Sequence, residues 1–385
     1  MRKILIVTCK DLTSKNYDGG KKRILDVAEF LSKKNQVDAV CISGNNIETN
    51  EKQGIFNKIE KFKINFFTRI LNSLIYITRM EPMQNGFFYS KEMYKFIEEN
   101  ENKYNTIIFH LTRSAQYLPN YFQGKKILEM TDLVSFNYSQ IVKKTSAFNP
   151  LKYIYFLEKI FLTKYEKRIS EFFDNIVFIS QNEFLFSKKI IDKNKIKIIG
   201  NSVKTMKILY KHKKNNNKIL FVGNINYTPN RLACFDFSNK ILPKLRKLYP
   251  EVEFAIVGKI NFIDRILLGL KRNVKIYGSV KKLDKLIKES ICGICNLDVT
   301  SGIQNKIFTY MSYGLPVISS ENSFPKELIK NKQILVYKND KQFLELILKL
   351  INNQNIAKKI SKNSFKVLKN KFNLNKVYAK YSRIV

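Results

Sequence analysis

The sequence contains few side chains of the kinds that bind metals or form disulfides. It has only two histidines, His110 and His212, and five cysteines without regular spacing in 385 residues. The one close pair, Cys292 and Cys295, lies in an apolar run typical of a buried strand, so we interpret both as core residues rather than zinc ligands. An odd number of scattered cysteines argues against a disulfide framework and favours a reducing cytoplasm.

Acidic residues are also scarce. The chain has 32 Asp and Glu residues against 69 Lys and Arg residues, which gives a formal net charge of +37. Nucleic-acid binding would require a recognised module or basic clusters on one face, and we find no such module, so we expect no nucleic-acid partner. Two compatible explanations remain open. One is attraction to an anionic membrane, at ~1 kcal/mol per basic residue near the lipid. The other is the Lys- and Asn-rich composition of chains from AT-rich genomes.

Long apolar runs are absent as well. No segment approaches the roughly 20 apolar residues that are needed to span a bilayer, and the apolar run at 4–7 is too short for a signal peptide. The segment 55–80 instead mixes basic residues such as Lys61 and Arg69 with apolar ones such as Phe66 and Leu71. This pattern fits either a segment that lies in a membrane interface or a core helix with a solvated basic face.

What the sequence does contain is a regular alternation of short apolar strands with helical segments. Strands are predicted at 3–8, 36–42, 104–110, 125–132, 175–180, 197–201, 219–224, 253–258, 273–280, 292–297 and from 317. This alternation is typical of parallel sheets with helices on both faces. A length of 385 residues exceeds the usual size of a single domain, so we predict two doubly wound α/β domains.

Two polar residues follow predicted strands at positions where parallel sheets bind ligands. His110 ends the strand 104–110, and Asp132 ends the strand 125–132. Ligands bind beyond the carboxyl ends of such strands, so both are candidate catalytic residues. Asp132 could instead cap the turn that follows it.

The most informative stretch is 299–319. Thr300 and Ser301 are suited to cap a helix, apolar residues then recur at helical spacing, and Gly314 is suited to end the helix. A helix N-terminus attracts anions, Gly302 would let a phosphate approach the backbone, and Lys306 would add a full positive charge. On spacing alone, the same residues could equally form an ordinary turn with one solvated lysine.

The run Gly302-Ile303-Gln304-Asn305-Lys306, followed by Tyr310 to Val317, resembles the donor-binding signature of family 4 glycosyltransferases. The closest subgroup is the sugar transferases of bacterial exopolysaccharide clusters. The resemblance covers essentially the whole chain and is strongest from Ile219 to Ser319. It implies a GT-B fold, in which two Rossmann-like domains face each other across a cleft.

The resemblance also implies a division of labour between the two domains. Residues 1–203 would form the acceptor domain, on which a C-terminal helix at about 372–385 packs back. Residues 204–217 would be the linker, and 218–371 the nucleotide-sugar donor domain.

Residue by residue, the family pattern assigns a set of donor contacts. These are Gly223, Asn224, Arg231, Tyr277, Gly278, Val280, Gly302, Ile303, Gln304, Asn305, Lys306 and Thr309. The chain departs from the pattern at three points, because Ser301 and Thr309 replace two glutamates and Asn224 replaces an arginine. Lys306 and the helix N-terminus are therefore expected to neutralise most of the donor phosphate charge.

On the acceptor side, the glycine pair Gly19 and Gly20 resembles the loop that follows the first strand in these enzymes, and Arg23 follows it. All three are assigned to acceptor binding. The pair does not match the GxGxxG pattern of nicotinamide sites and could also be a plain tight turn.

The function implied is transfer of a sugar from a nucleotide diphosphate sugar to a saccharide or lipid-linked acceptor, with retention and no essential metal. The setting expected is bacterial surface polysaccharide synthesis in the cytoplasm, on the inner face of the cytoplasmic membrane. The alternatives are a non-catalytic saccharide-binding or complex-forming subunit, because three family residues are replaced, and, with less support, a nucleotide-sugar epimerase. No motif in the sequence specifies the donor sugar, the nucleobase, the linkage or the oligomeric state.

Overall fold

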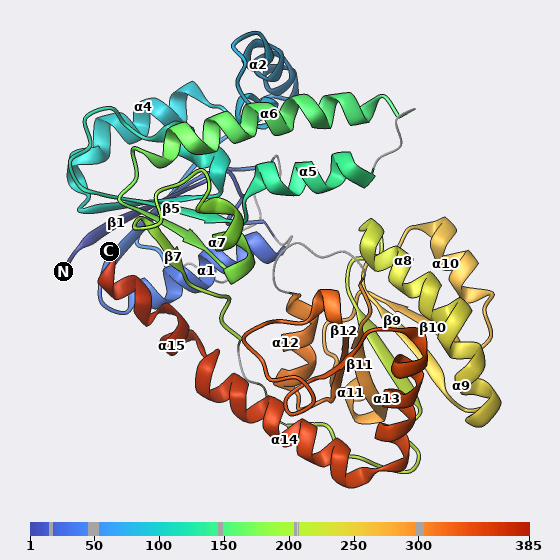
Figure 1. The fold of residues 1–385 in the computed structure, drawn as a ribbon. Coiled ribbons are helices and arrows are strands. Elements are labelled where there is room, and N and C mark those ends of the chain that lie inside the picture. The colour runs from blue at the N-terminus through green and yellow to red at the C-terminus, as the bar shows by residue number, and fades with distance from the viewer. Residues whose placement is uncertain (15–17, 45–53, 145–148, 204–205, 207, 298–303) are drawn as a thin grey trace. The chain divides into compact units, whose positions relative to one another are not determined.

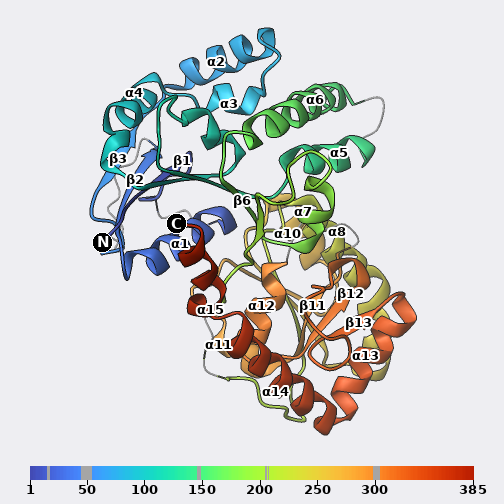
Figure 2. The same cartoon turned by 60° about the vertical axis from the view of Figure 1, so that its left-hand side comes forward.

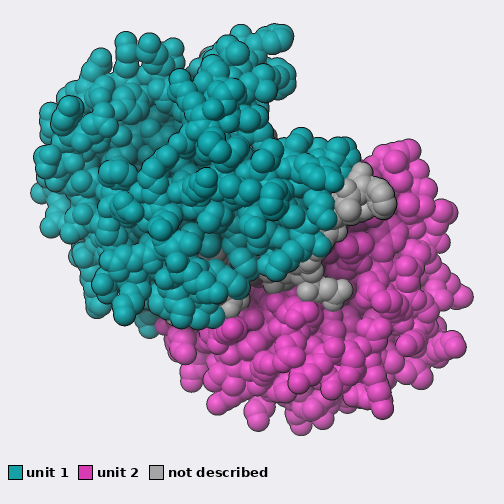
Figure 3. Space-filling view, turned by 45° about the horizontal axis from the view of Figure 1, so that its top comes forward, with its two compact units in different colours: residues 1–202, 374–385 teal, residues 203–373 magenta. Residues whose placement is uncertain are grey.

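The computed structural model describes residues 1–385 apart from 15–17, 45–53, 145–148, 204–205, 207 and 298–303. The chain forms two compact units, which Figure 3 shows in different colours. The first unit comprises residues 1–202 together with 374–385, and the second comprises residues 203–373.

The first unit is built on a seven-stranded parallel sheet with the order β3-β2-β1-β4-β5-β6-β7. Its strands are β1 (Lys3–Thr8), β2 (Gln36–Ile42), β3 (Ile59–Phe62), β4 (Thr106–His110), β5 (Lys125–Thr131), β6 (Asn175–Phe178) and β7 (Ile196–Ile198). The strand order reverses at β1 and β4, and their carboxyl ends are the usual ligand position in such sheets.

Helices cover both faces of this sheet. They are α1 (Gly19–Ser32), α2 (Phe66–Thr78), α3 (Met83–Phe87), α4 (Lys91–Asn100), α5 (Val134–Lys144), α6 (Leu151–Ser170) and α7 (Gln181–Ser187), with the 3₁₀ turns η1 (Glu101–Lys103) and η2 (Thr112–Tyr117). Figure 1 shows α1 on one face and α4, α5 and α6 on the other. Successive β1 residues serve the two cores, as strand geometry requires: Ile4 and Ile6 pack on the α1 side, and Leu5 and Val7 on the other.

The C-terminal residues complete the first of these cores. The helix α15 (Leu374–Tyr378) and the 3₁₀ turn η5 (Ala379–Arg383) follow the second unit in sequence, and α15 contacts α1. Tyr378 and Tyr381 are fully buried beside α1 residues such as Val27. The chain therefore returns to its first unit at its end (Figure 2).

The second unit has a six-stranded parallel sheet of order β10-β9-β8-β11-β12-β13. Its strands are β8 (Lys218–Val222), β9 (Glu253–Val257), β10 (Val274–Gly278), β11 (Ser290–Cys295), β12 (Val317–Ser320) and β13 (Leu335–Tyr337). Its helices are α8 (Thr228–Asp236), η3 (a π-helix, Phe237–Ile241), α9 (Leu242–Leu248), α10 (Phe262–Gly269), α11 (Asp284–Glu289), α12 (Asn305–Ser312), η4 (a 3₁₀ turn, Glu321–Ser323), α13 (Asp340–Asn352) and α14 (Gln354–Lys371). Two doubly wound parallel sheets confirm the predicted fold class.

Two local predictions need correction. The segment 55–80 is not one amphipathic element, because β3 pairs with β2 and only residues from Phe66 onward form helix α2. The helix of the central stretch begins at Asn305 and follows Gln304, whose side chain makes no cap hydrogen bond. The expected caps Thr300 and Ser301 lie outside the described residues. As expected, Cys292 and Cys295 are buried in β11.

Candidate functional site

In the first unit, His110 lies at the carboxyl end of β4, in register with Thr8 at the end of β1. Its Nδ1 is 2.9 Å from the Thr8 hydroxyl, whereas its Nε2 has no hydrogen-bond partner among the described residues. Burial, with smaller contributions from Arg113 and Lys10, lowers the pKa of His110 to about 3. The ring is therefore neutral at physiological pH and can offer Nε2 as a hydrogen-bonding group.

Asp132 follows the neighbouring strand β5. Its Oδ1 is buried without a hydrogen-bond partner in the described part of the chain, and burial raises the pKa of its carboxyl to about 6. Leu111, directly after His110, and Thr131, directly before Asp132, both have a φ of 70°, which is rare for residues other than glycine. Backbone strain of this kind clusters at functional sites, so these two strand ends are the strongest catalytic candidates in the unit.

The glycine pair begins helix α1 beside this site. Asp18 caps the helix by accepting a hydrogen bond of 2.8 Å from the Lys21 N–H, and it pairs with Lys10. A Cβ atom placed on Gly20 would lie 3.8 Å from Cε1 of His110. Gly19 and Gly20 therefore form the N-terminus of α1 and lie near His110, which is compatible with their predicted acceptor role.

Arg23, in contrast, is not available for a ligand in this structure. It is 2% exposed, and its guanidinium pairs at 3.3 Å with Glu129, which is fully buried in β5. It also donates to the carbonyl oxygens of Ile199, at 2.7 Å, and of Gly200. In this structure Arg23 has a structural role, because it joins α1, β5 and the segment after β7, and its acceptor role stays a prediction.

In the second unit, the corresponding edge begins with a close approach of two glycines. A Cβ atom on Gly258, whose φ is +140°, would lie 1.7 Å from the carbonyl oxygen of Gly223, which rules out any side chain there. Gly223 in turn lies against Asn230, whose Nδ2 would be 2.9 Å from an added Cβ. Gly278, at the end of β10, also has a positive φ of +66°. Beyond the carboxyl ends of β8, β9 and β10, the main chain at these three glycines therefore lies close together, and the Gly258 N–H donates to the Gly278 carbonyl oxygen at 2.8 Å.

Lys306 is the second residue of α12 and is only 8% exposed. Its Nζ donates a 2.7 Å hydrogen bond to Oδ1 of Asn230 and lies 3.7 Å from the centroid of the Phe221 ring. Among the described residues it forms no ion pair with a carboxylate, and burial lowers its pKa. A buried ammonium with only neutral partners, in the first turn of a helix, is suited to bind an anion.

The remaining predicted donor residues differ in their environments. Asn224 accepts, through its backbone oxygen, a 2.9 Å hydrogen bond from Asn230 Nδ2. Arg231 forms an ion pair with Asp264 at 2.8 Å, so its positive charge is already compensated by a carboxylate. Tyr277 is 40% exposed, and Val280 is half-buried beside the core of the unit.

On α12 itself, Asn305 is exposed, and the Thr309 hydroxyl donates to the Asn305 carbonyl at 3.0 Å. Gln304 directly precedes the helix and is half-buried. Ser301, Gly302 and Ile303 lie outside the described residues.

Two residues of this edge were not anticipated from the sequence. Asn230 joins Lys306 to the Asn224 backbone, and no local pattern distinguishes it from a helix-start asparagine. Tyr310 is fully buried; its hydroxyl accepts a 2.7 Å hydrogen bond from the Val222 N–H, and its ring lies over Gly293, where a Cβ would be 2.4 Å away. Tyr310 therefore fixes α12, and with it Lys306, against β8 and β11.

Neither edge offers a metal site in the described part of the chain, where no group of three or more His, Cys, Asp or Glu side chains is placed to hold an ion. Nor do the described residues include a helix of the length and hydropathy that a membrane crossing requires.

Comparisons with known proteins agree with this arrangement. Residues 216–353 match the family model described as "Glycosyl transferases group 1". The chain is 23% identical over 408 residues to the "Uncharacterized 44.6 kDa protein in cps region" of Klebsiella pneumoniae, with 98% of both chains covered. The fold is similar to that of Anabaena Alr3699/HepE in complex with UDP, with a TM-score of 0.68, 12% identity and coverage of 99% of this chain and 98% of that one.

A second solved structure is WaaG, a glycosyltransferase involved in lipopolysaccharide biosynthesis, with a TM-score of 0.67, 11% identity and 99% of each chain covered. At such low identities the structural likeness establishes the fold alone. The match to the family model lies within the second unit. Residues 216–353 therefore match the group 1 glycosyl transferases, and the two units have the predicted GT-B fold.

Proposed function

We propose that this protein transfers a sugar from a nucleotide diphosphate sugar to a saccharide or lipid-linked saccharide, with retention of anomeric configuration and without an essential metal. The observation on which the proposal chiefly rests is Lys306, a buried cation with neutral partners in the first turn of α12, inside the segment that matches the family model. Anabaena HepE, which shares the fold, was crystallised with UDP, and this supports a nucleotide sugar as donor.

The physical task of such a transfer is to stabilise the departing diphosphate. Lys306 and the N–H groups of the first turn of α12 would supply positive charge that is already oriented, so no reorganisation is needed as negative charge develops. In this proposal they take the part that a metal ion plays in other transferases. Because the phosphate charge grows in the transition state, the interaction would raise the rate as well as the affinity.

In the first unit, we assign the acceptor chemistry to His110 and Asp132. The neutral His110 ring would orient an acceptor hydroxyl through Nε2, because its Nδ1 is engaged with Thr8. Asp132, with a pKa near 6, is ionised at neutral pH and would bind a sugar hydroxyl or receive a proton.

The setting we propose is bacterial surface polysaccharide synthesis. The relative in a Klebsiella cps region and the structural likeness to WaaG support it. A cytoplasmic position on the inner membrane face would bring the enzyme to lipid-linked acceptors.

Helix α2 is the surface that we propose for membrane contact. None of its residues is buried. Six apolar side chains are at least 36% exposed and recur at helical spacing: Phe66, Phe67, Ile70, Leu71, Leu74 and Ile75. The surrounding segment 55–80 contains five cations and one acid, so an anionic lipid surface is its natural complement.

The rival function, a non-catalytic saccharide-binding subunit, is favoured by one observation: Arg231, the first cation after Asn224 in sequence, is paired with Asp264. Incubation with several nucleotide sugars in the absence of acceptor separates the two functions. A transferase releases nucleoside diphosphate slowly, whereas the rival binds saccharides and neither binds nor hydrolyses the nucleotide sugars.

A further inference from the structure

The first unit contains a pocket at the edge opposite to His110 and Asp132. Asp174 directly precedes β6, Lys195 directly precedes β7, and Lys126 is the second residue of β5. These three residues therefore mark the amino ends of the strands. Since β5 spans seven residues, the two edges of the sheet are separated by about 20 Å along the strand.

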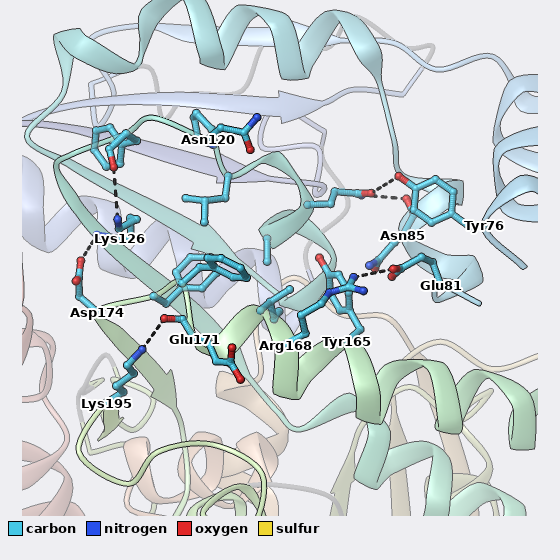
Figure 4. A pocket seen from close by; sticks show the side chains of 18 of the residues that line it. Tyr76, Glu81, Asn85, Asn120, Lys126, Tyr165, Arg168, Glu171, Asp174 and Lys195 are labelled. Carbon is cyan, nitrogen blue, oxygen red and sulfur yellow. Dashed lines mark hydrogen bonds and ion pairs between the residues drawn. The ribbon is translucent and has the colours of Figure 1, made fainter. Parts of the chain in front are cut away.

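The pocket has a volume of about 970 Å³ and is lined from several elements. Figure 4 shows two groups of side chains, with Lys126, Glu171, Asp174 and Lys195 on one side and Tyr76, Glu81, Asn85, Tyr165 and Arg168 on the other. A volume of this size is at the upper end of the range for small-molecule sites, so it can hold several sugar rings.

Part of the wall of this pocket has unsatisfied hydrogen-bonding capacity. Asn85 is fully buried, and neither its Oδ1 nor its Nδ2 has a partner among the described residues. The Tyr165 hydroxyl likewise has none, and its ring is 5% exposed. Buried polar groups are normally paired, so an amide and a phenol left unpaired at one pocket point to a polar ligand.

The charges of the pocket nearly cancel. It has four cations, Arg79, Lys126, Arg168 and Lys195, and three acids, Glu81, Glu171 and Asp174, although the whole chain has more than two cations per acid. Arg168 pairs with Glu81 at 2.7 Å, and Lys195 donates to the carbonyl oxygen of Glu171 at 2.7 Å. The net charge of the lining is therefore close to zero, which favours a neutral ligand over a phosphate or a nucleotide.

Some polar side chains of the pocket are hydrogen-bonded to one another, and aromatic rings lie beside them. The Tyr76 hydroxyl donates to Oε1 of Gln116 at 3.0 Å, and Nε2 of Gln116 donates to the main-chain carbonyl oxygen of Asn85 at 2.9 Å. Tyr76, Tyr165 and the exposed Phe172 add aromatic surface. Amide and carboxylate groups beside aromatic faces are suited to the hydroxyls and the C–H faces of sugars.

We propose that this pocket binds a neutral oligosaccharide, at a site separate from the transfer edge of the same sheet. The choice of a saccharide among neutral polyhydroxylated ligands rests on the proposed glycosyltransferase function, whose acceptor and product are saccharides. Such a site would retain the acceptor or product chain on the enzyme and raise its local concentration.

The test is calorimetric titration of the full chain with neutral oligosaccharides, from disaccharides to hexasaccharides, in the absence of nucleotide sugar. We expect at least one to bind with a millimolar or lower Kd, Asn85→Leu to weaken it at least about tenfold, and Tyr165→Phe to weaken it by a smaller factor. Because the altered groups have no hydrogen-bond partner in the described part of the chain, neither substitution should lower the melting temperature. The matched control is Tyr381→Phe, which removes another buried phenol without a hydrogen-bond partner among the described residues. It lies in the same unit but far from this pocket in sequence, and the substitution should leave binding unchanged.

Several outcomes would overturn the proposal. They are the absence of binding by any member of the panel, binding that Asn85→Leu and Tyr165→Phe leave intact, and inorganic phosphate binding that these substitutions abolish. If Asn85→Leu does not fold, Tyr165→Phe decides alone. Failure of the glycosyltransferase proposal is recognised separately, because it would appear as a lack of nucleotide-sugar binding and hydrolysis.

Discussion

The ammonium of Lys306 lies 2.7 Å from Oδ1 of Asn230, and the amide nitrogen of the same Asn230 lies 2.9 Å from the carbonyl oxygen of Asn224. Asn230 thus connects the helix α12 to the turn after β8. This turn is where the family pattern that the sequence resembles would place an arginine. Lys306 is thus a buried cation of this edge that is positioned by a neutral amide and the Phe221 ring.

Lys306→Ala should weaken nucleoside diphosphate binding roughly ten- to a hundredfold, because a charge-assisted hydrogen bond contributes about 1.5–3 kcal/mol. Turnover should fall further, since the leaving phosphate gains negative charge in the transition state. Calorimetry with nucleoside diphosphates measures the first effect. The exposed Lys338→Ala in the same unit is the control. Equal affinities for the wild type and Lys306→Ala would remove the donor site from α12.

Asp132→Asn should abolish most turnover while nucleotide affinity holds. In the wild type, kcat/KM should rise with pH around a midpoint near 6, where the Asp132 carboxyl ionises. This rise should be missing from any residual activity of the variant. An unchanged pH profile in the variant would return Asp132 to a capping role.

The same substitution has a stability signature. Burial raises the folded-state pKa of Asp132 from 3.8 to about 6, so between these values the folded protein binds more protons than the unfolded chain. The carboxyl therefore destabilises the fold increasingly as pH rises from about 4 to 6, and this penalty persists above 6. Asp132→Asn should gain melting temperature relative to wild type at pH 7 but not at pH 4, whereas the exposed Glu98→Gln should show no such difference.

Arg23→Met should destabilise the protein by about 3–5 kcal/mol, because it leaves the fully buried Glu129 without its cation. Urea unfolding of the variant measures this loss, and the neighbouring exposed Lys22→Met is the matched control. If Arg23→Met instead keeps full stability and only raises the KM for the acceptor, Arg23 is a ligand contact after all.

Phe67→Asp combined with Leu71→Asp should release the protein from anionic vesicles by about a hundredfold, since two apolar side chains would each lose about 1.5 kcal/mol or more of burial. Vesicle flotation measures this, and high salt should also release the wild type. The control pair is Leu248→Asp with Ile329→Asp, two exposed apolar residues of the second unit. Equal binding to neutral and anionic vesicles would show that charge does not contribute to membrane binding. Binding that the α2 substitutions leave unchanged would exclude α2 as the membrane-contacting surface.

The fold was predictable because its signal is local. Runs such as Ile4 to Val7 are apolar on both strand faces, as parallel strands buried on both sides must be, and helices of regular spacing separate them. His110 and Asp132 could be found for the same reason, since a strand end is visible in sequence.

The rest depends on contacts between distant segments. Arg23 and Glu129 are 106 residues apart, and nothing near either residue predicts a buried ion pair. The pocket of the first unit draws Asn85, Tyr165 and Lys195 from segments separated by up to 110 residues, so no motif could reveal it. The ion pair of Arg231 with Asp264 likewise joins two separate helices, α8 and α10, so the sequence near Arg231 could not predict it.

The central claim is that α12 binds the diphosphate of a nucleotide sugar that this protein then cleaves. The most direct test is release of nucleoside diphosphate from a panel of nucleotide sugars without acceptor, for the wild type and Lys306→Ala. The account predicts slow release from at least one donor by the wild type and at least about tenfold less by the variant. Absence of both binding and release for every nucleotide sugar, in a folded protein that still binds saccharides, would contradict it.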